Sequence, residues 1–284
     1  MRYLILHINC PDQRGIIAQF AGILYDHGAN VLHLEQHVEP DEKLFFMRIH
    51  ADLKNIEISE DVLNEILITQ VKKMDANIQF YYPENIQKMA IFVTKESAPL
   101  YDLLIKYRSG ELFCEIPCIV SNHKELGKIA NQFHIPFHFL PVTTDTKENQ
   151  EEEVRKLMKD KNIDILVLAR YMQILSKDFV EEYRGKIINI HHGFLPAFKG
   201  NSPYRQAWER GVKMIGATAH YVTADLDEGP IIEQDVVSVN HQHSVEEMIQ
   251  AGRDIERRVL TAAVKAHLEH RIILDGQRTI IFHA

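Results

Sequence analysis

Apolar and polar positions follow two rhythms along the first 83 residues. Some runs are apolar at every second residue, as in a strand with one buried face, and others repeat their apolar residues at helical spacing. Gly28 follows the first helical run and is suited to end it, since glycine readily adopts the left-handed backbone of a helix terminus. In order, a strand, a helix, two strands, a helix and a strand are predicted at residues 2–9, 14–27, 30–39, 43–52, 60–73 and 76–82.

Beyond a polar linker at 84–88, strands and helices alternate, which predicts a mostly parallel, Rossmann-like sheet built from right-handed β-α-β units. The run 164–169 is apolar almost throughout, as expected of a strand covered on both faces. Ser244 and Glu247 form a capping box that starts a long last helix. Strands are predicted at 89–94, 116–121, 137–140, 164–169, 186–191, 215–222 and 230–239, and helices at 98–109, 124–134, 147–161 and 244–270. The pattern indicates an α/β protein with domains at 1–83 and 89–284.

Composition narrows the possible partners. The 284 residues carry a net charge of −8, which argues against binding to nucleic acid or to acidic membranes. No apolar run approaches the ~20 residues that span a bilayer, and no signal peptide precedes the first strand. Cys10, Cys114 and Cys118 are expected to be reduced thiols of a cytoplasmic protein. Two closely spaced histidine pairs, His241 with His243 and His267 with His270, lack cysteine or carboxylate residues that would complete a ligand set. No metal site is therefore expected.

Candidate chemistry lies at the end of the strand 186–191. Side chains alternate along a strand, so Asn189 and His191 point the same way at its carboxyl end, where open α/β sheets bind ligands. With a carboxylate such as Asp227 from another loop, they can stabilise an oxyanion and move a proton. Taken singly, each has a plainer interpretation, because Asn and His often cap loops and Asp227 precedes a Gly-Pro turn.

The segments NIHHGFLPAFKGNSPYRQAWERG and GATAHYVTADLDEGPIIEQ, which begin at Asn189 and Gly216, resemble the folate-dependent formyltransferase family, and the resemblance extends over about 89–240. It implies that Asn189, His191 and Asp227 are the catalytic residues and that His220 lies beside them, although a purely structural role for His220 stays open. Gly193 departs from the family, where a serine is usual.

The segment LARYMQILS at 168–176 resembles the part of that family that lines the folate pocket. The resemblance implies that the backbone around Gln173 and Leu175 binds the pterin-like ring and that Met172 and Leu175 form apolar walls. Without the resemblance, Met172 and Leu175 would be interpreted as core residues.

The N-terminal β-α-β-β-α-β order is the ferredoxin-like pattern, and the motifs CPDQRGI at 10–16 and HGAN at 27–30 resemble an ACT domain. The resemblance implies an amino-acid effector or a subunit interface, and Asp12, Gly15 and Asn30 are the candidate residues. A tight helix entry, or an ACT domain that serves assembly alone, explains the same motifs. Because such a small sheet exposes a face or an edge, a homo-oligomer, either a dimer or a tetramer, is expected.

The first strand–helix loop of the second domain, 93–100, distinguishes among acceptors of the formyl group. It has no glycine, it carries Glu96, and Pro99 lacks an amide hydrogen, so a phosphate cradle is not expected. Relatives that formylate tRNA place a basic domain after the catalytic one, unlike this acidic chain. Water is then the simplest acceptor, and the chain resembles the members of the family that hydrolyse 10-formyltetrahydrofolate and so balance one-carbon units and supply formate for purine synthesis.

In the mechanism that this resemblance implies, Asp227 positions or deprotonates the water and holds His191. Asn189 and His191 stabilise the oxyanion, and His191 protonates the leaving N10. No cofactor is expected, because folate is the substrate. Two alternatives stay open. One is formyl transfer to a small non-phosphorylated amine, and the other is a sensor that binds an amino acid without turnover.

Overall fold

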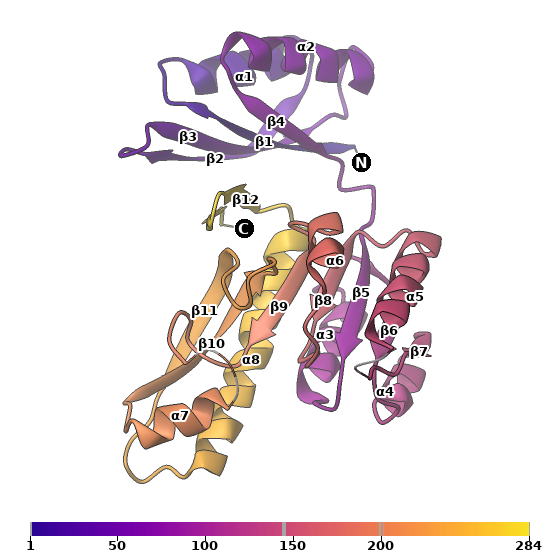
Figure 1. Ribbon diagram of the computed structural model, residues 1–284. Coiled ribbons are helices and arrows are strands. Elements are labelled where there is room, and N and C mark those ends of the chain that lie inside the picture. Colours follow the sequence, from indigo (N-terminus) through magenta and orange to yellow (C-terminus); the bar gives the residue numbers. More distant parts are fainter. Residues whose placement is uncertain (1, 144–145, 199, 201, 284) are drawn as a thin grey trace. The chain divides into compact units, whose positions relative to one another are not determined.

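The computed structural model describes residues 2–143, 146–198, 200 and 202–283 and divides into two compact units (Figure 1). One unit comprises Met1–Ile86 with Glu269–Asp275 and Ile280–Ala284, and the other comprises Gln87–Leu268 with Gly276–Thr279. The division at 84–88 stays a prediction, and the structure adds that C-terminal residues belong to the first unit.

The first unit is built on a four-stranded antiparallel sheet with the order β2-β3-β1-β4. The expected β-α-β-β-α-β order is confirmed. The first helix ends at Asp26, and Gly28 has a φ of 82°, so the predicted helix ending is also confirmed. The elements are β1 (Tyr3–Pro11), α1 (Ile16–Asp26), β2 (Asn30–Glu39), β3 (Leu44–Asp52), α2 (Glu60–Lys73) and β4 (Asn77–Tyr81).

Two apolar clusters cover this sheet. One packs α1 and α2 onto it through fully buried residues such as Phe20 and Leu67. The other joins Phe46 of β3 to Ile273 and Phe282 of the C-terminal segment, which forms the hairpin β12 (Ile272–Asp275) and β13 (Arg278–Ile281). This hairpin was not predicted, and it means that the start and the end of the chain share one core.

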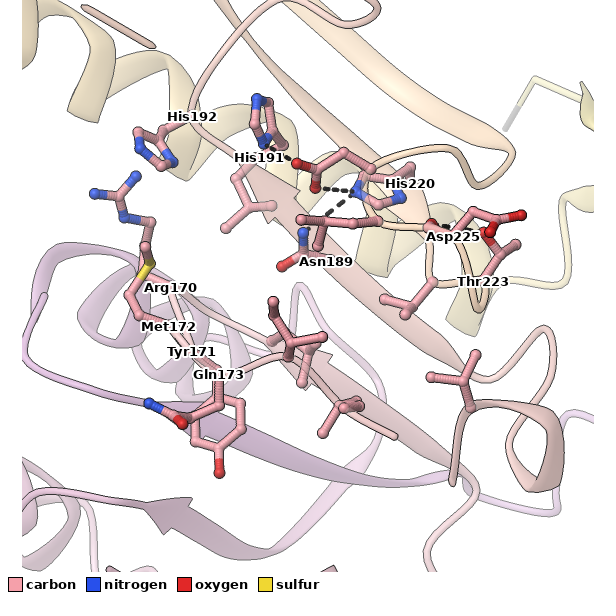
Figure 2. A pocket seen from close by; sticks show the side chains of 18 of the residues that line it. Arg170, Tyr171, Met172, Gln173, Asn189, His191, His192, His220, Thr223 and Asp225 are labelled. Carbon is pink, nitrogen blue, oxygen red and sulfur yellow. Dashed lines mark hydrogen bonds and ion pairs between the residues drawn. The ribbon is translucent and has the colours of Figure 1, made fainter. Parts of the chain in front are cut away.

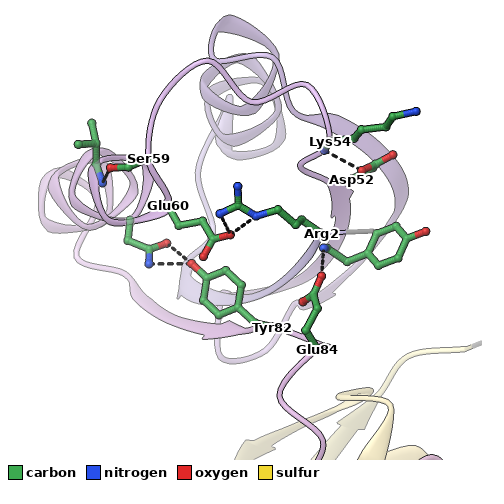
Figure 3. A network of polar contacts seen from close by, with 10 residues as sticks. Arg2, Asp52, Lys54, Ser59, Glu60, Tyr82 and Glu84 are labelled. Carbon is green, nitrogen blue, oxygen red and sulfur yellow. Dashed lines mark hydrogen bonds and ion pairs between the residues drawn. The ribbon is translucent and has the colours of Figure 1, made fainter.

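Polar contacts connect the first residues of the chain and residues 82–84 with each other and with α2 (Figure 3). Arg2 Nε donates to Glu60 at the start of α2 at 2.9 Å, and the backbone N–H of Tyr3 donates to Glu84 at 2.7 Å. Asn64 of α2 donates to the Tyr82 hydroxyl at 2.8 Å. Residues 82–84 are therefore held by the first unit.

His7 makes the stability of the first unit depend on pH. It is 4% exposed, and its Nε2 donates to the carbonyl of His270 at 2.8 Å. Burial, with a smaller effect of Arg48, lowers the pKa of His7 to about 4. Below about pH 6.5 the unfolded chain takes up this proton before the folded one, so the stabilisation is complete above that pH and is lost as the pH falls toward 4.

We expect the free energy of unfolding to fall by about 1.4 kcal/mol per pH unit from this residue between pH 6 and 5. Urea unfolding followed by circular dichroism at each pH measures the slope. His7→Gln keeps a donor for His270 and should flatten the curve, whereas His241→Gln, at an exposed residue, should not. Equal slopes for both variants would contradict this role of His7.

The second unit is a seven-stranded sheet with the order β11-β10-β9-β8-β5-β6-β7, parallel from β9 to β7 and antiparallel at β10 and β11. The mostly parallel Rossmann-like sheet is thus confirmed. Its elements are β5 (Lys88–Val93), α3 (Ala98–Arg108), β6 (Glu115–Ser121), α4 (Gly127–Gln132), β7 (Phe137–Phe139), α5 (Lys147–Asp160), β8 (Ile165–Leu168), α6 (Lys177–Glu182), β9 (Ile187–His191), α7 (Pro203–Glu209), β10 (Met214–Tyr221), β11 (Ile231–Ser238) and α8 (Val245–Leu268).

Helices cover both faces of this sheet. Apolar residues of α5 and α6 pack on one face, and α8 packs against β9, β10, β11 and α3 on the other (Figure 1). The predicted capping box starts α8, since the Ser244 backbone N–H donates to Glu247 at 2.8 Å and the Glu247 backbone N–H donates back to the Ser244 hydroxyl at 3.2 Å. In the described ranges, no helix combines the length and apolar character needed to cross a bilayer.

The strand order places a crevice at one point of the sheet edge. From β5 the chain moves outward through β6 and β7, then returns to the other side of β5 and builds β8 and β9. Loops at the carboxyl ends of the strands diverge where the order reverses, and ligands bind in that crevice. The segments after β5, β8 and β9 are therefore the ones that the fold brings to a site.

Candidate active site

A cavity of about 270 Å³ lies at the carboxyl ends of β8 and β9. Its walls come from the segment after β8, from β9 and the loop that follows it, and from the loop between β10 and β11. The lining residues include all three predicted catalytic residues, His220 and the three predicted folate-binding residues: Met172, Gln173, Leu175, Asn189, His191, His220 and Asp227. The structure thus brings these seven residues to one cavity, while their roles stay predictions.

Asp227 connects two histidines within this cavity, His191 and His220, and Figure 2 shows these two rings with Asn189. Its Oδ2 lies 3.2 Å from Nδ1 of His191, and its Oδ1 lies 3.7 Å from Nε2 of His220. The Asn189 side-chain nitrogen lies 3.2 Å from the same His220 nitrogen. The antiparallel pairing of β9 with β10 creates this arrangement, because it places Asn189 opposite His220.

The charge of Asp227 is set by these neighbours. Burial alone raises the pKa of a carboxyl group, but the two neighbouring histidines, His191 first and His220 second, outweigh burial and hold the pKa of Asp227 below its usual value. The group is therefore a carboxylate at neutral pH, a hydrogen-bond acceptor that can orient a water molecule and stabilise a positively charged His191.

The partners of His220 assign its proton. Its Nδ1 lies 2.9 Å from the carbonyl oxygen of Tyr221, which can only accept, so Nδ1 carries the hydrogen. In the neutral ring Nε2 then accepts from the Asn189 amide. That amide nitrogen has two hydrogens, and the second one is left for a ligand in the cavity.

The loop that carries Asp227 has a specific backbone shape. Asp227 has a φ of 57°, in the left-handed region. Gly229 lies so close to β10 that a Cβ built on it would be 1.7 Å from the carbonyl oxygen of Tyr221. The aspartate is therefore aimed at the two histidines by a turn that requires glycine two residues later.

Two hydrogen bonds of the Thr218 hydroxyl, on β10, fix the loop after β9. The hydroxyl donates to the carbonyl of Gly193 at 2.9 Å and accepts from the Leu195 N–H at 3.0 Å. A Cβ on Gly193 would be 3.0 Å from Nε2 of His191, a buried nitrogen without a hydrogen-bond partner among the described residues. Glycine at 193, the departure from the family noted above, thus leaves the His191 ring uncrowded.

The predicted folate-binding segment presents apolar side chains to the cavity. Met172 is 54% exposed, so the alternative of a core residue is wrong for it, whereas Leu175 lines the cavity and also packs on the core. The backbone N–H of Met172 donates to Thr94 after β5 at 3.1 Å, and that of Ser176 donates to the buried Glu151 at 2.7 Å. Exposed apolar side chains on a backbone that hydrogen bonds hold in place are typical of a ligand-binding surface.

Sequence reasoning assigned no role to Arg170 and His192, which also line the cavity. Burial, then the charges of Arg170 and His191, lower the pKa of His192 to about 3, so this ring is neutral. Arg170 and His192 both lie inside the segments quoted above, LARYMQILS and NIHHGFLPAFKGNSPYRQAWERG. A further signal for Arg170 was a charged residue directly after an almost wholly apolar strand.

The candidate effector residues of the first unit are not together in one copy of the chain. Asn30 pairs with Asp52, which pairs with Tyr3 at the start of β1, whereas Asp12 and Gly15 follow the end of β1. Strands rise about 3.3 Å per residue, so the two places lie about 26 Å apart along the strand. A site that uses all three needs a second copy of the unit.

Within the part of the chain that the structure describes, no cluster of three or more His, Cys, Asp or Glu side chains is arranged to hold a metal ion. The three cysteines are buried and unpaired, and burial raises the pKa of each thiol.

The formyl transferase family model matches residues 87–264, and the ACT domain model matches residues 4–67. Formyltetrahydrofolate deformylase from Synechocystis sp. is 48% identical over 277 residues, which cover 98% of this chain and 97% of that protein. The protein of the same name from Bacillus subtilis is 43% identical over 279 residues, with coverage of 98% and 93%.

A crystal structure of a formyltetrahydrofolate deformylase from Pseudomonas syringae pv. tomato matches with a TM-score of 0.96 and 39% identity, covering 100% of this chain and 95% of that one. These likenesses include both units and the segments that line the cavity. The chain therefore belongs to the formyltetrahydrofolate deformylase family, with an N-terminal ACT domain and a C-terminal formyl transferase domain.

Proposed function

We propose that the chain is an enzyme that hydrolyses 10-formyltetrahydrofolate to formate and tetrahydrofolate. The observation that carries this proposal is Asp227 between His191 and His220, in a cavity whose opposite wall exposes Met172. The names of relatives along nearly the whole chain support the same reaction. It balances one-carbon units and supplies formate, a source of carbon for purine synthesis.

In the proposed mechanism the folate lies against residues 172–175 with its formyl group toward Asn189 and His191. The Asp227 carboxylate stabilises the positive charge on His191, and it takes up the proton that the water loses as the new carbon–oxygen bond forms. The free Asn189 hydrogen and the His191 ring bind the oxyanion, and His191 then protonates N10 as the carbon–nitrogen bond breaks. The folate itself carries the formyl group, so the proposal needs no further cofactor.

A direct assay tests the function. Purified protein is incubated with 10-formyltetrahydrofolate and no amine, and formate and tetrahydrofolate are measured together. Equal amounts of both products support hydrolysis. Formation of tetrahydrofolate only after a small amine is added would instead favour the transferase alternative, and no turnover under either condition would favour a sensor.

Glycinamide ribonucleotide is expected neither to bind nor to be formylated. The loop after β5 places Glu96 where a phosphate would need amide donors, and its carboxylate accepts from Arg253 of α8 at 3.2 Å. Pro99 in the first turn of α3 offers no N–H. Isothermal titration and a formyl-transfer assay measure both properties. Micromolar binding would contradict this interpretation of the loop.

For the first unit we propose a homo-oligomer and an amino-acid effector held between copies. The separation of Asn30 from Asp12 within one copy favours such a shared site. The edge strand β2 offers an open pairing surface, where Leu32 is 49% exposed. The reduced state of the buried thiols fits a cytoplasmic location.

Light scattering is expected to give the mass of a dimer or a tetramer for the intact chain. Leu32→Lys places a charge on β2 and should lower that mass, while Lys72→Ala on the last turn of α2 should not. A monomer at micromolar concentration would contradict the proposed assembly.

A further inference from the structure

Arg170 lines the cavity with a strained backbone and with two side-chain donors that lack hydrogen-bond partners in the described part of the chain. It follows β8 with a φ of 62°, a left-handed backbone that residues with a Cβ rarely adopt. Its Nε and Nη1 atoms are buried, and neither has a hydrogen-bond partner among the described residues. Strain and unsatisfied donors at one side chain mark a functional position, because a fold can be stable without them.

A buried carboxylate lies behind Arg170. Oε2 of Glu256, on α8, is 3.6 Å from the Arg170 Nη1, and Oε1 accepts from the Tyr204 hydroxyl of α7 at 2.7 Å. The hydroxyl packs against Gly252, where a Cβ would come within 2.1 Å of it. Two helices thus hold Glu256 in place, and Glu256 holds the guanidinium group.

The Arg170 side chain lines a part of the cavity away from Gln173 of the predicted folate-binding segment. Figure 2 shows Arg170 reaching toward the His192 ring, away from the side chain of Gln173. Both Arg170 and His192 line the same cavity as His191 and Asp227. An acceptor that attacks the formyl carbon must come from a direction that the folate does not occupy. If the folate lies against residues 172–175 as proposed, the side of the cavity with Arg170 and His192 is open to such an acceptor.

We propose that Arg170, held by Glu256 and Tyr204, fills the place of an amine acceptor and so restricts the acceptor of the formyl group to water. The inference rests on the proposed hydrolysis and identifies what determines its specificity. A guanidinium group stays protonated in proteins, so it cannot itself be formylated. It repels ammonium groups, while water is small enough to reach the carbon beside it.

The inference predicts a second reaction when this side chain is removed. The nitrogen of a neutral amine attacks the formyl carbon, and the bond from that carbon to N10 breaks. The proton that the amine loses replaces the formyl group on N10. The products are an N-formyl amine and tetrahydrofolate, and the same Asn189, His191 and Asp227 serve both reactions.

The test compares Arg170→Gly with the wild type. Glycine relieves the left-handed backbone, and a second variant, Arg170→Gly with Glu256→Gln, removes the unpaired carboxylate while keeping an acceptor for Tyr204. The control is Asn162→Gly, at an exposed turn residue after α5 with a φ of 50°. Each protein receives 10-formyltetrahydrofolate and increasing glycinamide, and mass spectrometry measures N-formylglycinamide and formate. A thermal melt checks folding.

The ratio of N-formylglycinamide to formate should rise with glycinamide in both Arg170 variants, at least tenfold above the ratio for the wild type and the control. An unchanged ratio in a folded Arg170 variant that still turns over folate overturns the inference, since a purely structural arginine would alter rates without altering the products. A wild type that releases no formate in the absence of amine would instead contradict the proposed function.

Discussion

Replacing Asp227 with asparagine is expected to lower the turnover of 10-formyltetrahydrofolate by ~10²-fold or more, and His191→Ala by a similar factor, since positioned acid and base groups contribute about that much. Asparagine keeps the size of the side chain but removes the charge that stabilises a protonated His191, 3.2 Å away. Steady-state formate release measures the loss, and a thermal melt shows whether each variant is folded.

The matched controls are Asp160→Asn and His241→Ala, which make the same chemical changes at exposed residues. Both should retain wild-type turnover. A folded Asp227→Asn or His191→Ala protein that kept most of its activity would place the chemistry on other residues of the cavity.

Gly229→Ala is expected to cause a comparable loss of activity together with a loss of stability. The new Cβ would lie 1.7 Å from the backbone carbonyl oxygen of Tyr221, which also accepts from His220. The loop must move to relieve the overlap, and Asp227 moves with it. Overpacking of this kind costs about 1–3 kcal/mol, so the melting temperature should fall as well.

Gly22→Ala is the control for this variant. Gly22 lies inside α1, and a Cβ there would meet nothing within 4 Å, so alanine should leave turnover unchanged and raise stability slightly, as it does in helix interiors. A Gly229→Ala protein with full activity and an unchanged melting temperature would show that the loop does not need this close approach.

The regular elements of this fold were largely predictable, because most are amphipathic or uniformly apolar. The strand predicted at 164–169 was recognisable from its almost unbroken apolar run. The long last helix was recognisable from its capping box at Ser244 and Glu247. The helix predicted at 124–134 is confined to Gly127–Gln132, and the residues before it form a turn in which the Gly127 N–H donates to the Lys124 carbonyl. The short helices α6 and α7 were missed, because six or seven residues give too little periodicity to recognise.

The site was predictable in its residues but not in its connections. Alternation along β9 pairs Asn189 with His191, but only the antiparallel register of β10 places His220 opposite Asn189. The Arg170–Glu256 pair joins a residue near the middle of the second unit's sequence to one near its end, and no local pattern marks it. The hairpin at Asp275–Gly276 did carry a signal, since Asp-Gly between apolar alternations favours a tight turn.

The C-terminal hairpin has a consequence for the synthesis of the chain. Phe46 is made early, whereas Ile273 and Phe282, which complete its cluster, follow more than two hundred residues later. Domains usually fold in the order in which they leave the ribosome. Here Phe46 of the first sheet must stay uncovered while the entire second sheet is translated. Nascent chains stalled shortly before Ile273 should therefore bind a chaperone that recognises exposed apolar side chains. The binding surface, around Phe46, is covered in the finished protein.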